Sequence, residues 1–212
     1  MKSIYVDTET TGTDPKKHAL IQLAGVIVID GMVKETFDFK IRPFKGDMLD
    51  PKALEVNKTT RQELETYPES LIQHMAFEKM LGAYIDKFDR TDKAHFIGWN
   101  ADFDADFVRQ FMIRHERDQK DYFGSWFYYP ILDICKIAGF QLREIRHQFE
   151  NFKLLTVAKH LGIEFDPAQA HNAAFDIDLT MRICDMCLDP AVPLKQRFIG
   201  DGTPKEDAAR RW

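Results

Sequence analysis

The N-terminal part of the chain carries three apolar stretches whose composition is typical of β-strands. Ser3–Thr8 is short and rich in β-forming residues, Leu20–Ile29 is a longer apolar run, and Met32–Ile41 alternates apolar with polar positions. Asp30-Gly31 lies between the last two stretches and is a common hairpin turn. Three consecutive strands joined by tight connections predict an antiparallel meander.

Helical spacing of apolar residues dominates the rest of the chain. Asp50-Pro51 is a typical helix start. Four segments repeat apolar side chains every three or four positions and are predicted as helices: residues 68–88, 101–116, 153–161 and 172–188. Two short apolar segments between them, residues 95–99 and 128–134, are predicted as buried strands.

This order of elements indicates the fold class. Strands first, followed by alternating helices and strands, predict an α/β protein with a mixed sheet flanked by helices. The sequence shows neither an internal repeat nor a low-complexity linker, so we expect one domain over residues 1–188. Residues 189–212 are rich in proline and glycine. We expect them to be irregular, and either part of the same domain or peripheral.

Composition and charge narrow the class of function. The chain has 212 residues, with 44% hydrophobic and 30% charged residues, which is typical of a globular protein. Its 29 Lys and Arg residues against 34 Asp and Glu residues give a formal net charge of −5. A protein whose main task is to coat duplex nucleic acid normally needs a basic surface. An enzyme that meets phosphates through bound cations remains compatible with this charge.

The cysteines and the N-terminus indicate the cellular setting. Cys135, Cys184 and Cys187 are too few for a disulfide scaffold. Cys184 and Cys187 form a CxxC on a predicted helix, where we expect reduced core thiols; a zinc or redox role is the alternative. The chain starts with a strand-like segment instead of an apolar signal core, and it has no apolar run of membrane-spanning length. We therefore expect a soluble, cytoplasmic protein.

Two acidic residues at the end of the first predicted strand are the first sign of chemistry. Asp7 and Glu9 are two positions apart, so their side chains point to the same face of a strand. Carboxylates placed in this way repel each other unless a cation lies between them, and Mg²⁺ is commonly held by such groups. A solvated strand end is the alternative interpretation of this pair alone.

Two further acids follow in helical segments. Asp104 lies near the start of the helix that follows the buried stretch 95–99, and Asp176 lies on an otherwise apolar helix shortly after His171. Taken singly, Asp176 is compatible with a charge at a helix N-terminus, and His171 with a cap or a loop residue.

Together these residues resemble the DEDD-type (DnaQ-like) 3′-5′ exonucleases, in the variant with a histidine base (DEDDh). Three segments carry the resemblance: YVDTETTG at Tyr5–Gly12, NADFDADF at Asn100–Phe107, and HNAAFDIDLT at His171–Thr180. The stretch LDICKIA, with Asp133, also resembles the segment that commonly precedes the third motif. Gln22 departs from the pattern, because relatives often carry an acid there.

The resemblance implies a ribonuclease H-like fold with a mixed five-stranded sheet, and a reaction that releases nucleoside 5′-monophosphates from a 3′ end. It implies two Mg²⁺ ions per site, with Mn²⁺ as an alternative. Asp7 would bridge the ions, Glu9 and Asp176 would assist the ion that carries the attacking water, and Asp104 would assist the other. His171 would accept the proton from that water.

The resemblance also implies contacts to the terminal nucleotide. Thr10, Thr11 and Gly12 would present backbone and hydroxyl groups to it, and Asn100 and Phe103 would complete the substrate-binding set. Two of these residues have a structural alternative, since Phe103 has the spacing of a core residue with Phe107, and Asn100 is well placed to cap the following helix. The aromatic run 126–129 is expected to pack in a strand.

Several functions remain open at this point. We favour single-stranded DNA as substrate and a free-standing enzyme, with association with a polymerase as a further possibility. A 3′-5′ exoribonuclease of the same family is the main alternative, because the residues do not show how the 2′-hydroxyl is read. An aspartyl phosphatase is disfavoured by Glu9 at the second acidic position. A non-catalytic nucleic-acid-binding or scaffold domain would gain nothing from clustered, mutually repelling acids.

Overall fold

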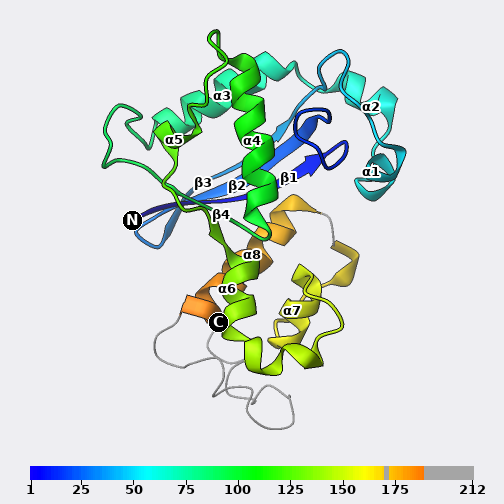
Figure 1. Ribbon diagram of the computed structural model, residues 1–212, viewed down its shortest axis with the longest axis vertical. Coiled ribbons are helices and arrows are strands. Elements are labelled where there is room, and N and C mark those ends of the chain that lie inside the picture. The colour runs from blue at the N-terminus through cyan, green and yellow to red at the C-terminus, as the bar shows by residue number, and fades with distance from the viewer. Residues whose placement is uncertain (170–171, 189–212) are drawn as a thin grey trace.

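A five-stranded mixed sheet forms the centre of the molecule. The structure, a computed structural model, describes residues 1–169 and 172–188. Its sheet has the strand order β3-β2-β1-β4-β5 (Figure 1). The strands are β1 (Lys2–Thr10), β2 (Leu20–Ile29), β3 (Met32–Lys40), β4 (His95–Gly98) and β5 (Leu132–Asp133). The first three pair antiparallel, whereas β4 is parallel to both β1 and β5. The predicted meander and mixed sheet are confirmed.

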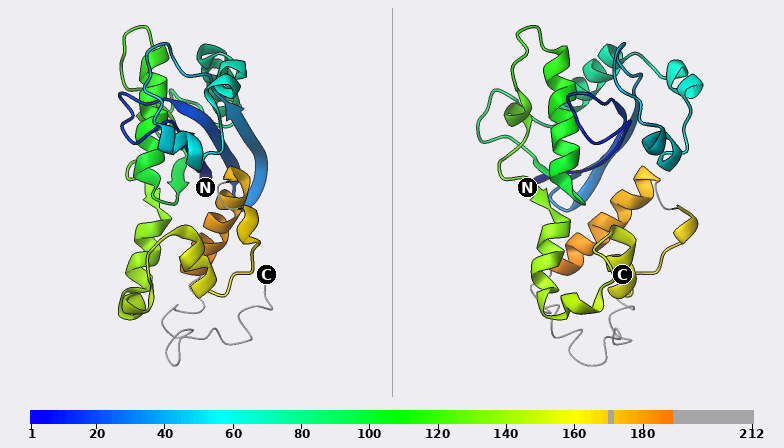
Figure 2. Two further views of the ribbon diagram at one scale, coloured as in Figure 1. Left: turned by 90° about the vertical axis from the view of Figure 1, so that its right-hand side faces the viewer. Right: turned by 45° about the vertical axis from the view of Figure 1, so that its right-hand side comes forward.

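Helices surround this sheet. In chain order, the helices among the described residues are α1 (Pro51–Val56), α2 (Arg61–Thr66), α3 (Ser70–Gly82), α4 (Ala101–His115), α5 (Phe123–Trp126), α6 (Ile134–Gln141), α7 (Leu154–His160) and α8 (Ala173–Leu188). Two 3₁₀ turns, at Arg143–Gln148 and Pro167–Gln169, lie before and after α7. Figures 1 and 2 show α6, α7 and α8 gathered on one side of the sheet, away from α3 and α4.

The alternation of side chains along β1 feeds two separate apolar clusters. Ile4 and Val6 pack with residues of α3 and α4, such as Phe77 and Phe107. Tyr5 points the other way and packs with residues of α6, α7 and α8. The central strand is thus covered on both faces, which is why Ile4, Tyr5 and Val6 are three consecutive apolar residues before Asp7.

Two predicted elements differ from the structure. Helix α3 ends at Gly82, whereas the spacing predicted a helix to residue 88; the carboxylates of Asp86, Asp89 and Asp92 accept backbone N–H groups there and hold the chain in turns. The strand predicted over residues 128–134 is reduced to β5. Asp133 accepts a hydrogen bond from the Cys135 N–H and starts α6.

Other features of the fold bear on the expectations from composition. Cys184 and Cys187 are buried free thiols on α8, as expected for core residues, and burial raises the pKa of Cys187 to about 12. Trp126 ends the short helix α5, and Phe127 makes only an isolated bridge with Ala94, so the prediction that residues 126–129 pack in a strand is wrong. In the described part of the chain, no helix combines the length and the apolar character that crossing a bilayer requires.

Candidate active site

Asp7 and Glu9 lie near the C-terminal end of β1, in the middle of the sheet. In the register of β1 with β2, Asp7 is opposite Ala24 and Glu9 is opposite Gln22. Both side chains are on the face of β1 that carries Tyr5, which is the face covered by α8. The strand therefore holds the two carboxylates side by side, as the spacing predicted.

Thr8 lies between these acids and points to the opposite face, towards α4. Its hydroxyl donates a hydrogen bond of 2.6 Å to Asp104 Oδ1, and its backbone N–H donates another of 3.0 Å to the same atom. Asp104 is 4% exposed. Thr8, the middle residue of the Asp-Thr-Glu segment, thus holds the Asp104 carboxylate in place. This role was not predicted from the sequence.

Helix α8 brings the fourth acid to the same place. Asp176 lies in its first turn, and the Asn172 side chain accepts hydrogen bonds from the Ala174 and Phe175 N–H groups just before it. This is the usual arrangement at a helix N-terminus. Asp176 is near enough to raise the pKa of both Asp7 and Glu9.

The pKa values of the acids record their crowding. Burial, followed by the charges of Asp104, Glu9 and Asp176, raises the pKa of Asp7 well above its usual value. Burial and the charge of Asp176 raise the pKa of Glu9 to about 7, although Lys40 opposes the shift. Burial raises the pKa of Asp104 to about 7 against the opposing effect of the Thr8 hydrogen bonds. The structure therefore brings all four predicted acids into one interacting group.

This donor set fits divalent cations. Buried carboxylates that repel one another are stable in their ionised form only when a positive charge compensates them. Carboxylate oxygens are the ligands that Mg²⁺ and Mn²⁺ prefer. Asp7, Glu9, Asp104 and Asp176 are the residues that would hold such ions.

Asp133 supports the start of α4 from the neighbouring strand. Its Oδ1 atom accepts the Asn100 N–H at 3.1 Å and the Cys135 N–H at 3.0 Å. Asn100 adopts a left-handed backbone conformation with φ of 62° and makes no side-chain capping hydrogen bond to α4. Asn100 therefore occupies the N-cap position of α4, where its carbonyl accepts the Phe103 N–H, but its side chain does not cap the helix. The neighbouring Asp133 carboxylate holds the turn.

The loop after β1 corrects one expectation. The Thr10 hydroxyl donates to the Gly12 carbonyl at 2.7 Å, and the fully buried Thr11 hydroxyl donates to the Met48 carbonyl at 2.7 Å. The Thr11 hydroxyl also accepts the Ala19 N–H, so it is engaged within the protein as both donor and acceptor. The Thr10 hydroxyl has already donated its one proton and could only accept from a nucleotide. The backbone of Thr10, Thr11 and Gly12 remains the part of this loop proposed to meet substrate.

Phe103 and His171 complete the predicted site residues. Phe103 is partly buried, and its ring lies 5.0 Å from the ring of Phe107, at the edge of the core on the α4 side. Its predicted packing with Phe107 is thus present, while part of the ring stays accessible. His171 lies outside the described residues.

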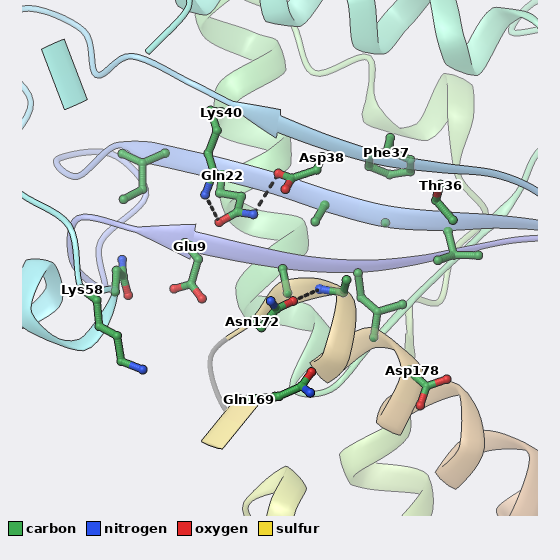
Figure 3. A pocket seen from close by; sticks show the side chains of 18 of the residues that line it. Glu9, Gln22, Thr36, Phe37, Asp38, Lys40, Lys58, Gln169, Asn172 and Asp178 are labelled. Carbon is green, nitrogen blue, oxygen red and sulfur yellow. Dashed lines mark hydrogen bonds between the residues drawn. The ribbon is translucent and has the colours of Figure 1, made fainter. Parts of the chain in front are cut away.

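A groove of about 950 Å³ runs along the sheet, and Glu9 is the one of the four acids that lines it. Figure 3 shows Glu9 from β1, Lys58 from the segment after α1, and Asn172 before α8 projecting into it. Further along it, the Lys40 ammonium donates to Gln22 Oε1 at 2.6 Å, opposite Glu9 in the sheet. The presence of Lys40 and Lys58 beside the candidate site was not predicted from the sequence. The strand register would have indicated Lys40, whereas Lys58 carries no local signal.

Residues 4–184 match the model of the exonuclease family RNase_T, a segment that contains all four acids and most of the chain. The chain belongs to this exonuclease family. It is a member of the DEDD-type 3′-5′ exonucleases, and it is an enzyme of that class. The matched segment includes β1 from Ile4 onwards, all of α4, and α8 as far as Cys184, which are the elements that position the acids.

Several exonuclease relatives are similar over most of the chain. A ribonuclease T from Photorhabdus laumondii is 31% identical over 86% of this chain and 82% of its own length. Another, from Shewanella frigidimarina, is 28% identical over 85% of this chain and 79% of its own length. The 3′-5′ exonuclease DinG of Bacillus subtilis is 26% identical over 84% of this chain, which spans 16% of that longer protein.

Solved structures show the same fold. Exonuclease I of E. coli in complex with a dT13 oligonucleotide aligns with a TM-score of 0.68 at 20% identity. The alignment covers 87% of this chain and 40% of that one. The likeness identifies the ribonuclease H-like fold, as the resemblance implied.

Proposed function

We propose that this enzyme removes nucleotides one at a time from the 3′ end of single-stranded nucleic acid, with DNA favoured, and releases nucleoside 5′-monophosphates. The observation that carries the proposal is the group of four acids, in which burial and then mutual repulsion raise the pKa of Asp7 and Glu9. Such an arrangement costs stability, and a metal-dependent phosphodiester hydrolase is the class of enzyme that uses it.

The four acids are proposed to hold two Mg²⁺ ions, with Mn²⁺ as an alternative. Ions bound there supply Lewis acidity and neutralise charge on the reacting phosphate. Asp7 is proposed to contribute to both ions, Glu9 and Asp176 to one, and Asp104 to the other. Thr8 keeps the Asp104 oxygen oriented and favours its ionised form, because the two hydrogen bonds lower its pKa.

His171 is proposed as the general base that accepts the proton of the attacking water. An imidazole with an ordinary pKa is largely unprotonated at neutral pH and can take up a proton there. In the sequence, His171 is one residue before Asn172 and five residues before Asp176. The backbone of Thr10, Thr11 and Gly12, together with Asn100 and Phe103, is proposed to meet the terminal nucleotide.

The second candidate substrate is RNA. The relatives named ribonuclease T favour it, whereas the oligonucleotide bound to the exonuclease I neighbour favours DNA. We propose that residues 1–188 form a single exonuclease domain. Association with a polymerase is a lesser proposal, supported by a 26% identical DNA polymerase III PolC-type protein of which the chain spans 11%.

The decisive experiment uses 5′-labelled single-stranded DNA and RNA of the same sequence, each with Mg²⁺, with Mn²⁺ and with a chelator. We expect a ladder that shortens from the 3′ end only when a metal is present, with DNA degraded faster than RNA. Faster loss of RNA would select the second candidate substrate. Internal cuts, or equal activity with the chelator, would contradict the proposed reaction.

A further inference from the structure

A second group of potential metal ligands lies where α3 meets the end of α4. His74 and Glu78 are on α3, and Glu116 is the residue at which α4 ends. Each offers one ligand atom, and these atoms all lie within 4.8 Å of one another. Glu116 is twelve residues beyond Asp104, which corresponds to about 18 Å along a helix. The group is therefore separate from the four acids.

Local structure explains why these side chains meet. His74 and Glu78 are four positions apart, so they share one face of α3. Glu116 is fixed against α4, because its backbone N–H donates to the Met112 and Ile113 carbonyls. The His74 ring is 4% exposed, lies edge-on to the Phe111 ring at 5.5 Å, and stacks on the His115 ring at 4.9 Å.

The His74 ring has an unmet bonding requirement. Its Nε2 atom is buried and finds no hydrogen-bond partner among the described residues. Leaving such an atom unpaired in the interior is costly, and the two nearby carboxylates do not come close enough to satisfy it. A cation bound between the three side chains and coordinated by Nε2 would satisfy this requirement.

Charge and protonation suit a metal. Burial lowers the pKa of His74 despite the opposing effect of Glu78 and Glu116, so the imidazole is neutral at neutral pH with a lone pair available. Lys87 is the neighbouring cation, with its ammonium 3.5 Å from Glu78 Oε1. That ammonium also lies over the Trp126 ring at 5.2 Å, an alternative contact that it can keep if Glu78 turns to a metal.

We propose that His74, Glu78 and Glu116 form a divalent-metal site suited to Zn²⁺, which joins α3 to the C-terminal end of α4. One imidazole nitrogen and two carboxylate oxygens leave a fourth position for water, a common zinc arrangement. Tetrahedral donors with bonds near 2.0–2.1 Å lie about 3.3 Å apart, so the group needs to close by no more than roughly 1.5 Å. Glu78 and Glu116 are only partly buried and can make this movement.

Zinc binding to the full-length protein tests the site. The four acids are first saturated with excess Mg²⁺, and Zn²⁺ is then titrated by calorimetry into the wild type and into Glu78→Gln and Glu116→Gln. We expect the wild type to bind one more high-affinity equivalent of Zn²⁺ than either variant, in which the affinity of that equivalent falls at least tenfold. Any Zn²⁺ that displaces Mg²⁺ from the four acids is common to all three proteins. Glu65→Gln removes the same charge from an exposed position on α2 and is expected to bind like the wild type.

Two further readouts keep the outcome clear. Zn²⁺ is expected to raise the melting temperature of the wild type by several degrees, and less in either variant, because it binds only the folded site. Co²⁺ in place of Zn²⁺ is expected to give the visible absorption of a four-coordinate N/O site, lost in both variants. Equal Zn²⁺ affinity in the wild type, Glu78→Gln and Glu116→Gln would overturn the proposal, whatever the effect on nuclease activity.

Discussion

At the scale of single residues, Thr8 connects two parts of the candidate site. It separates Asp7 from Glu9 in the sequence, yet its hydroxyl and its N–H both serve Asp104 on another element. The acids themselves could be predicted, because the sequence contains the three motifs that resemble those of the exonuclease family. The role of Thr8 could not, since it depends on which face of β1 meets α4.

Replacing Thr8 by valine is expected to weaken metal binding at the four acids. The substitution keeps the shape but removes the hydroxyl that donates to Asp104. A hydrogen bond to a charged group contributes about 1.5–3 kcal/mol, so we expect metal affinity to fall about tenfold or more, and turnover with it. Calorimetry with Mn²⁺ measures the affinity. Thr66→Val on α2 is the matched control, and a Thr8→Val protein that binds Mn²⁺ like Thr66→Val would contradict the assigned role.

Alanine substitutions at His171 and Asp7 are expected to have different effects on turnover and metal binding. His171→Ala should lose most turnover but keep metal binding, because the four acids are intact. Asp7→Ala should lose both, because it removes the carboxylate that interacts with all three others. Mn²⁺ binding and single-strand degradation are measured in parallel. Comparable metal binding by the wild type and Asp7→Ala would contradict the assignment of the site.

At the scale of elements, most periodic segments and the helix start at Asp50-Pro51 were predictable, whereas boundaries set by aspartate side chains were not. The limits of β2 agree with its apolar run, and α4 and α8 agree with their spacing to within one residue. The prediction of a strand over residues 128–134 was wrong because the apolar residues around Asp133 suit both a strand and a helix. The Asp133 carboxylate decides between them by capping α6, a contact that spacing does not reveal.

The join between β4 and α4 is expected to tolerate no added side chain at Gly98. A Cβ there would lie 2.9 Å from the Val6 carbonyl oxygen and 3.3 Å from Ala101 Cβ. We expect Gly98→Ala to cost about 1–3 kcal/mol of unfolding free energy, as overpacking usually does, and to reduce turnover by moving α4 and Asp104.

Chemical denaturation and the degradation assay measure the two effects of Gly98→Ala. Gly124→Ala on α5 is the control, because a Cβ there would meet no atom within 4 Å. Equal stability of the two variants would show that the join has room to adjust.

At the scale of the whole molecule, the four acids oppose folding when no metal is bound. Their charges accumulate where β1, α4 and α8 converge, between the two apolar clusters that stabilise the sheet. The fold could be predicted from sequence because its core follows regular patterns. The unfavourable free energy of the four buried acids could not be predicted from the sequence, since it depends on how far the fold removes them from water.

The metal-free protein is expected to become less stable as the pH rises from about 4 to about 7. In the fold, Glu9 and Asp104 keep their protons up to a pKa of about 7, whereas in the unfolded chain they ionise near 4.5 and 3.8. Their contribution is therefore complete at low pH and is lost as the folded groups approach ionisation. For Glu9 alone the loss is on the order of 3 kcal/mol.

Thermal unfolding at several pH values, with a chelator or with Mg²⁺, measures this effect. We expect Mg²⁺ to raise the melting temperature more at pH 8 than at pH 5, because it binds the ionised acids. Glu9→Gln should be more stable than the wild type at pH 8 without metal, and should show a smaller dependence on pH. The same dependence in both proteins would exclude Glu9 as a source of this unfavourable free energy.

Asp7, Thr8 and Glu9 point alternately to the two faces of β1. The candidate site therefore forms only when β1 pairs in the correct register. A slip of one position would turn both acids inward against α4 and leave the threonine facing α8, so three of the four carboxylates would be misplaced at once. Gradual repair by neighbouring side chains is impossible for such an error. An insertion or deletion within β1 is therefore expected to disrupt the site, whereas one in a connecting loop would leave the facing of these three side chains unchanged.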